Sequence, residues 1–215
     1  MLAQPGDLFA VWGADRASRI ITWGTATPFA PRGLRLGPSH VAICAEHPRL
    51  GRLWCESSTL SLSPCWIRGE CVDGCQSHPI ARRRFEIELA GGRVEHFRLS
   101  PIASLTTAES GLLSDILFKH FICRGVRYDW GHVLLAGTRV FKRTRLMPAE
   151  TLDAVFCSEL VAACLMQLGR LGRSNPTRYS PADLLRELVR NGTYQRVADD
   201  QPQRVGNYSL YREAA

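Results

Sequence analysis

The sequence predicts an α+β fold in which an antiparallel β-sheet packs against a helix. Residues 39–45 and 53–58 alternate in character as strands do, because every second side chain of a strand shares a face. Residues 153–169 instead repeat apolar side chains at helical spacing, from Cys157 to Leu168, and end at Gly169. No repeat or long linker divides the chain, so we expect residues 1–215 to form a single domain.

Shorter signals fill in the remaining elements. We expect strands at 7–12 and 93–99, and a short helix or strand at 17–23. A strand at 84–89 would pair with 93–99 across the turn Gly91-Gly92, and residues 47–51 would connect the first two strands. The pattern also predicts helices at 106–123, capped by Thr106 or Thr107, and from Ser180 to Val189, with edge strands near 194–197 and 208–211. Residues 25–38 and the Cys-rich stretch 64–79 are expected to be irregular.

The overall charge limits the classes of partner. The chain carries a formal net charge of +7, and its tightest basic cluster is Arg82, Arg83 and Arg84. No nucleic-acid-binding motif accompanies this cluster, so we interpret it as a solvated basic face and expect no nucleic-acid partner. The positive charge is compatible with a membrane surface or a cell wall. Oligomeric state is not indicated.

The N-terminal segment and the cysteines bear on location. The first residues lack a basic region and a long apolar run, and no apolar stretch is long enough to span a bilayer. We therefore expect a cytoplasmic protein at synthesis, with delivery by a phage or a secretion apparatus as a compatible route. Eight cysteines without a signal peptide favour reduced thiols, a metal site or catalysis over a disulfide framework.

Three residues could form a thiol catalytic site. Cys157 is expected at the start of a helix, where unpaired N–H groups and the helix dipole favour a thiolate. His40 could act as its base if its strand lies under that helix, and Glu56 on the neighbouring strand could orient the imidazole. Taken alone, the pattern fits a core cysteine, an ordinary histidine and an exposed glutamate better.

Several motifs along the chain change that balance. In order, they are Gly6-Asp7-Leu8-Phe9, Ser39-His40-Val41-Ala42-Ile43, Cys55-Glu56-Ser57-Ser58, Tyr128-Asp129-Trp130, Phe156-Cys157-Ser158-Glu159-Leu160-Val161 and Ser180-Pro181-Ala182-Asp183-Leu184. Together they resemble the circularly permuted branch of the NlpC-type papain-like superfamily, the YiiX-like permuted amidases. The Phe-Cys-Ser-Glu-Leu-Val block is the most specific of them.

The resemblance implies a papain-like, NlpC-like core with permuted chain order. It implies Cys157 as nucleophile, His40 as base and Glu56 as third member, with no cofactor. It also places Tyr128 near the substrate, while the Cys157 and Ser158 amides would contribute to the oxyanion hole. Residues 25–38 are longer than the family pattern and could form a lid or a wall of the substrate cleft.

The resemblance implies a cysteine hydrolase, an amidase or peptidase working through an acyl-enzyme, and leaves the substrate open. Peptidoglycan stem peptides and lipid or acyl amides are both compatible substrates. An acyltransferase or thioesterase of the same fold is one alternative. A catalytically idle module that binds acyl chains or peptides is another.

Cys65, Cys71, Cys75 and His78 form a weak candidate for a Cys3His zinc site. Their spacing matches no standard zinc motif, and unrelated free thiols are the favoured interpretation. A zinc-stabilised interaction module would be the function if this site existed.

Overall fold

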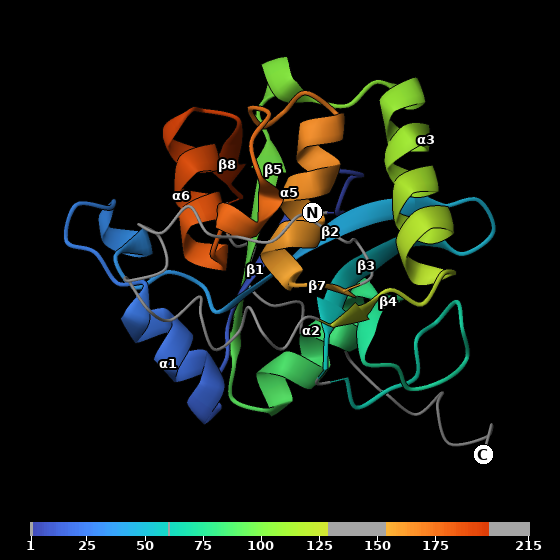
Figure 1. Cartoon of the computed structure of the whole chain (residues 1–215), viewed down its shortest axis with the longest axis horizontal. Helices are drawn as coiled ribbons and strands as arrows, with labels where there is room; N and C mark the ends of the chain where they lie inside the picture. Colours follow the sequence, from blue (N-terminus) through green and yellow to red (C-terminus); the bar gives the residue numbers. More distant parts are fainter. Residues whose placement is uncertain (1, 60, 129–153, 198–215) are drawn as a thin grey trace.

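The computed structural model describes residues 2–59, 61–128 and 154–197, and within them it shows the predicted α+β fold (Figure 1). An eight-stranded sheet has the order β7-β6-β4-β3-β2-β1-β5-β8. Its strands are β1 (Leu8–Trp12), β2 (His40–His47), β3 (Gly51–Ser58), β4 (Gly74–Pro79), β5 (Arg93–Leu99), β6 (Arg127–Tyr128), β7 (Ala154–Val155) and β8 (Tyr194–Arg196).

The helices are α1 (Arg16–Gly24), α2 (Ile80–Leu89), α3 (Thr107–Asp115), α5 (Cys157–Gln167) and α6 (Pro181–Arg190). Short helical turns cover Arg32–Leu34, Pro101–Ala103 and Pro176–Arg178, and a π-helical segment, Ile116–Ile122, continues α3. No helix in the described part of the chain is long and apolar enough to cross a membrane.

Strand pairing in the centre of the sheet sets the two faces. His40 pairs with Val11 of β1, and Ile43 pairs with Cys55 of β3. Because side chains alternate, Ala42 and Cys44 of β2 share a face with Trp54 and Glu56 of β3. This is the shared face that the sequence predicts.

The two faces are covered by different helices. Val41, Ile43 and Cys55 belong to the main core, which α5 supplies with Leu160 and Leu165. The opposite face forms a smaller core of Phe9, Val11, Ala42, Cys44, Trp54 and Val94, packed against Ile80 and Ile87 of α2. The β2 strand therefore lies under α5 as predicted. Alternation along β2, however, places His40 with Ala42 and Cys44 on the face that α2 covers.

The predicted strand at 84–89 is wrong, because this segment lies within helix α2. Alternation of Phe85, Ile87 and Leu89 suggested a strand. In the structure Phe85 and Leu89 are exposed, and Arg83 and Glu86 point inward instead. Ion pairs one turn apart, such as Arg84–Glu88 at 2.7 Å, add local support to the helix.

Two smaller expectations also need correction. The stretch 64–79 is not wholly irregular, because it ends in strand β4, which pairs with β3 along its length. The sheet is not purely antiparallel, because β6 and β7 run parallel, with Tyr128 beside Val155. This parallel pair brings the chain to the start of α5.

The other predicted elements are present. Thr106 caps α3 through a capping box with Glu109, and Ser180 caps α6 by accepting from the Asp183 N–H at 3.1 Å. The predicted edge strand at 194–197 is β8, paired with β5. The edge strand expected at 208–211 lies outside the described residues.

Candidate functional site

The candidate site lies at one end of the sheet, where β2 begins and α5 begins. Residues 154–155 form β7 and lead directly into Phe156 and Cys157. The hydroxyl of Ser57, on β3, donates to the Val155 carbonyl oxygen at 2.7 Å. The sheet thereby fixes the strand from which the α5 helix starts.

Glu56 is a fully buried carboxylate with three partners. Its Oε2 accepts from the Trp54 indole at 2.7 Å and lies 2.8 Å from His40 Nε2. Its Oε1 lies 2.7 Å from Nε of Arg83, which comes from α2. Burial alone would raise the pKa of Glu56, but the charge of Arg83 and then the bond to His40 hold it well below its usual range. Glu56 is therefore an anion that faces the imidazole.

His40 joins this carboxylate to the cysteine. Cys157 and Glu56 both act on His40, and their charge and hydrogen bonding are the causes that raise the pKa of the imidazole. Burial opposes a charge on His40, but the charge of Cys157 and the hydrogen bonds to Cys157 and Glu56 raise its pKa to about 10. Since Nε2 faces Glu56, Nδ1 is the ring nitrogen left for the thiol. The raised pKa favours the imidazolium form of His40 at neutral pH.

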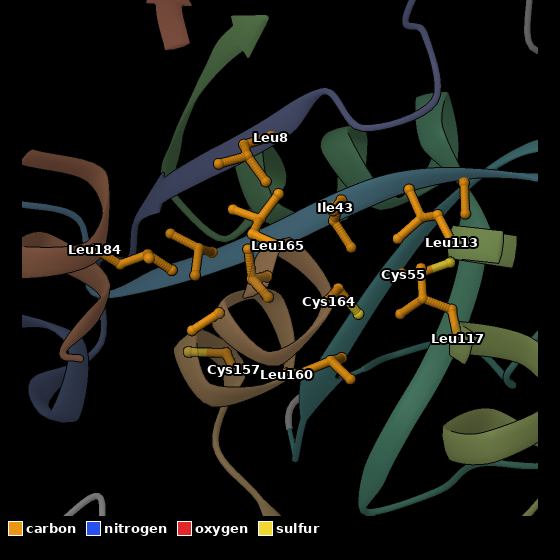
Figure 2. Packing of buried hydrophobic residues seen from close by; sticks show 14 of the residues in the cluster. Leu8, Ile43, Cys55, Leu113, Leu117, Cys157, Leu160, Cys164, Leu165 and Leu184 are labelled. Atoms are coloured by element: carbon orange, nitrogen blue, oxygen red, sulfur yellow. The ribbon is translucent and has the colours of Figure 1, made fainter. Parts of the chain in front are cut away.

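Cys157 occupies the first turn of α5, as predicted from its spacing (Figure 2). Figure 2 shows Leu160, Cys164 and Leu165 on the turns that follow, packed toward the strands. The Phe156 N–H donates to the Glu159 carboxylate at 2.8 Å and closes the helix start. Amides in a first helical turn have no carbonyl partner within the helix, so they can donate to an oxyanion.

The site opens to solvent at the histidine. Cys157 and Glu56 are fully buried, whereas 18% of the His40 side chain is exposed. Among the described residues of this triad, the imidazole is therefore the group that reaches the surface.

The other two predicted site residues border the cysteine. Tyr128 packs its ring 5.8 Å from that of Phe156, and burial, followed by the charge of Cys157, raises its pKa above the usual range. It is therefore a neutral phenol close to the thiol. The Ser158 hydroxyl donates to the Tyr179 carbonyl oxygen at 2.6 Å, so its proton is not offered to a substrate.

The candidate zinc residues do not converge. Cys65 and Cys75 belong to the core under α5, and Cys71 is exposed. His78 has the parity of the opposite face and lies 3.3 Å from the Ser61 hydroxyl and 3.0 Å from Gln76 Oε1. In the described ranges no three His, Cys, Asp or Glu side chains are grouped to hold a metal ion.

Sequence reasoning missed two residues that hold Glu56. Trp54 donates to the carboxylate and stacks on Phe9 with ring centroids 4.4 Å apart. Arg83 is 5% exposed rather than part of a solvated basic face, and its guanidinium also lies 3.1 Å from Glu86. The hydroxyl of Ser63 donates in turn to Glu86. The only advance signal was helical spacing of Arg83 and Glu86, which the strand-like alternation obscured.

Comparison with known proteins identifies the fold. No family model matches the sequence, and no curated protein matches it. A solved structure of metalloprotein yiiX from Escherichia coli O157:H7, a DUF1105 protein, is similar with a TM-score of 0.54 and 16% sequence identity. The match covers 94% of this chain and 100% of that chain. The chain therefore has a YiiX-like fold.

Proposed function

We propose that this protein is a cysteine-dependent hydrolase of papain-like chemistry with permuted chain order, acting on an amide or related acyl bond. The observation that carries the proposal is the position of His40 at the start of β2, where one ring nitrogen lies 2.8 Å from the Glu56 carboxylate and Cys157 is near enough to raise the pKa of the imidazole. Both His40 and Glu56 precede Cys157 in the chain, as in the permuted order that the motifs resemble.

In the first step, the Cys157 thiolate attacks the acyl carbon and a bond forms between sulfur and carbon. The amides at the α5 N-terminus donate to the oxyanion as the carbonyl double bond opens. The tetrahedral intermediate collapses, the carbon–nitrogen bond breaks, and the imidazolium of His40 gives its proton to the leaving amine. Glu56 keeps the ring oriented and stabilises its charge.

In the second step, water replaces the amine. Neutral His40 takes a proton from the water, whose oxygen attacks the thioester carbon. The carbon–sulfur bond then breaks, which releases the carboxylic acid and restores the thiolate and imidazolium. Tyr128, whose ring packs against Phe156, borders the start of α5 and would shape the substrate pocket.

The name of the yiiX neighbour describes it as a metalloprotein. Here both carboxylate oxygens of Glu56 are already engaged by His40, Trp54 and Arg83. We therefore assign no step of this chain's reaction to a metal.

The test is to incubate the protein with muropeptides and with panels of acyl amides and thioesters, and to follow products and adducts by mass spectrometry. We expect an acyl adduct on Cys157, and we expect Cys157→Ala and His40→Ala each to abolish turnover. Glu56→Gln should reduce turnover less. Cys164→Ala is the matched control, since Cys164 lies two turns along the same helix and burial raises its pKa to about 12.

Labelling with iodoacetamide near neutral pH separates an enzyme from a catalytically idle binding module. Preferential reaction of Cys157 over Cys71 and Cys123, which are exposed, supports the enzyme, because only an activated thiol reacts faster than accessible ones. Full activity in Cys157→Ala would refute the mechanism. Transfer of the adduct to an added amine or alcohol instead of water would identify an acyltransferase.

A further inference from the structure

Helix α1 presents an exposed stripe that mixes arginines with large apolar side chains. Arg16, Arg19, Ile20 and Trp23 follow the spacing i, i+3, i+4 and i+7 and so share one face of the helix. Ile20 is 66% exposed and Trp23 is 70% exposed, whereas Ile21 is buried against the core. A basic amphipathic helix with an aromatic residue on its exposed side is typical of membrane-surface binding.

The segment after α1 extends the same chemistry. Phe29 is 96% exposed, and Arg32 and Arg35 are exposed as well. Residues 16–38 contain no Asp or Glu. The charge of this region is therefore complementary to an anionic surface, while Trp23 and Phe29 offer apolar area that would enter the headgroup layer.

This segment is fastened to the body of the protein. Arg186 of α6 donates to the carbonyl oxygens of Thr25 at 2.7 Å, Leu34 at 2.9 Å and Arg35 at 3.0 Å. The Trp12 indole donates to the Leu36 carbonyl oxygen at 2.9 Å. The exposed apolar side chains are thus held outward by fixed backbone, and they lose little conformational freedom on binding.

The region adjoins the candidate site. Strand β1 leads into α1 at the end of the sheet where its Val11 pairs with His40. The Gly13 N–H donates to the Ser39 hydroxyl at 3.1 Å, so the approach to α1 is tied to the residue before His40. Figure 1 shows α1 beyond the end of the sheet at which β2 and α5 begin.

We propose that Arg16, Arg19, Ile20, Trp23 and Phe29, the α1 surface, bind an anionic lipid bilayer and present the site to an amide or acyl bond of a membrane lipid. The choice of substrate rests on the proposed function; the binding does not. The exposed surface of α1 combines apolar and basic side chains, which suits a lipid substrate because a lipid has to be reached at the membrane interface.

Binding is tested with full-length Cys157→Ala protein, so that turnover plays no part. We expect it to sediment with vesicles of phosphatidylcholine and phosphatidylglycerol, and far less with phosphatidylcholine alone. Arg16→Gln with Arg19→Gln should lower the partition coefficient roughly thirtyfold, and Ile20→Ser with Trp23→Ser should lower it comparably. Ile102→Ser and Arg49→Gln, both exposed and at the opposite end of the sheet, are the matched controls.

Trp23 gives a direct readout of insertion. Brominated lipids should quench tryptophan emission in the parent protein, and Trp23→Phe should remove most of that quenching while vesicle binding persists. Equal binding to neutral and anionic vesicles, or variants of the α1 surface that bind like the controls, would overturn the proposal. Tight binding to single-stranded RNA with none to vesicles would also overturn it, in favour of a soluble polyanion.

Turnover separates this proposal from the proposed function. In protein that keeps Cys157, the double substitution Ile20→Ser with Trp23→Ser should slow cleavage of a lipid amide in vesicles. It should leave cleavage of a soluble short-chain amide unchanged. If vesicles bind and neither substrate is cleaved, the enzyme assignment fails and the lipid surface stands. If the soluble amide is cleaved and vesicles do not bind, the α1 surface proposal fails.

Discussion

Removing the Arg83 guanidinium should reveal how strongly the site depends on α2. Arg83→Gln leaves the Glu56 carboxylate buried with Trp54 and His40 but without the cation 2.7 Å from its Oε1. Breaking a buried ion pair from one side costs about 3–5 kcal/mol, because a charge stays buried without compensation. For a chain of this size, at about 2–4 °C per kcal/mol, the melting temperature should fall by roughly 6–20 °C.

Arg82→Gln is the matched control, because it removes a neighbouring guanidinium from the same helix. Its side chain is half exposed and lies 3.5 Å from Glu86. An exposed pair contributes at most about 1 kcal/mol, so this variant should melt within a few degrees of the parent protein. Thermal unfolding at neutral pH measures the melting temperature of both variants.

The pH dependence gives a second readout of the same variant. The pKa of Glu56 is lower in the folded protein than in the unfolded chain. This difference stabilises the folded protein at any pH above the unfolded-state pKa, and the stability is lost as the pH falls through the folded-state pKa. Without Arg83 that pKa rises, so Glu56 is protonated earlier and its buried charge is removed. The stability gap between the parent protein and Arg83→Gln should therefore narrow in acid. If Arg83→Gln were as mild as Arg82→Gln, and its stability difference from the parent protein did not change with pH, the reasoning would be refuted.

Three further outcomes follow from other contacts. The pKa of His40 is higher in the folded protein than in the unfolded chain, so its contribution to stability is complete below the unfolded-state pKa and is lost as the pH rises toward about 10. His40→Gln should weaken this loss of stability at alkaline pH, as measured by chemical denaturation at a series of pH values. Ser57→Ala removes the donor to the Val155 carbonyl and should cost about 1–3 kcal/mol while slowing turnover, whereas Ser104→Ala, on an exposed turn, should do neither. Arg186→Met leaves three carbonyl groups without their donor, so limited proteolysis should cut residues 25–38 much faster than in the parent protein, and unchanged cleavage would contradict the fastening role.

Local patterns predicted the central strands and the helices of the second half of the chain. Alternation placed Trp54 and Glu56 on one face, and apolar spacing placed Cys157 on the first turn of a helix that packs inward. These features depend on neighbours within a few residues, which the sequence displays directly. The meeting of His40, Glu56 and Cys157 came from the resemblance, since strand and helix patterns carry no distance between segments.

The α2 region could not be predicted in the same way. Its Phe85, Ile87 and Leu89 alternate like a strand, yet Arg83 and Glu86 are the side chains it buries. Arg83 lies next to Glu56, a carboxylate 27 positions earlier in the chain. Burial of an arginine is unfavourable without a partner, and that partner is visible only after folding. The triplet Arg82, Arg83 and Arg84 therefore resembled a solvated surface in the sequence, whereas Arg83 is buried and holds Glu56 in the structure.

The location of His40 at the first residue of β2 explains how one imidazole serves both faces of the sheet. Its parity directs it toward Glu56 and the α2 side, whereas Cys157 belongs to the core on the α5 side. A histidine two residues further along, at Ala42, would keep that parity but have the sheet between it and the sulfur. A histidine at Val41, one residue after His40, would face α5 and turn away from Glu56. Only at the strand's end can the ring reach around the backbone, so the site depends on where β2 starts as much as on which residues it contains.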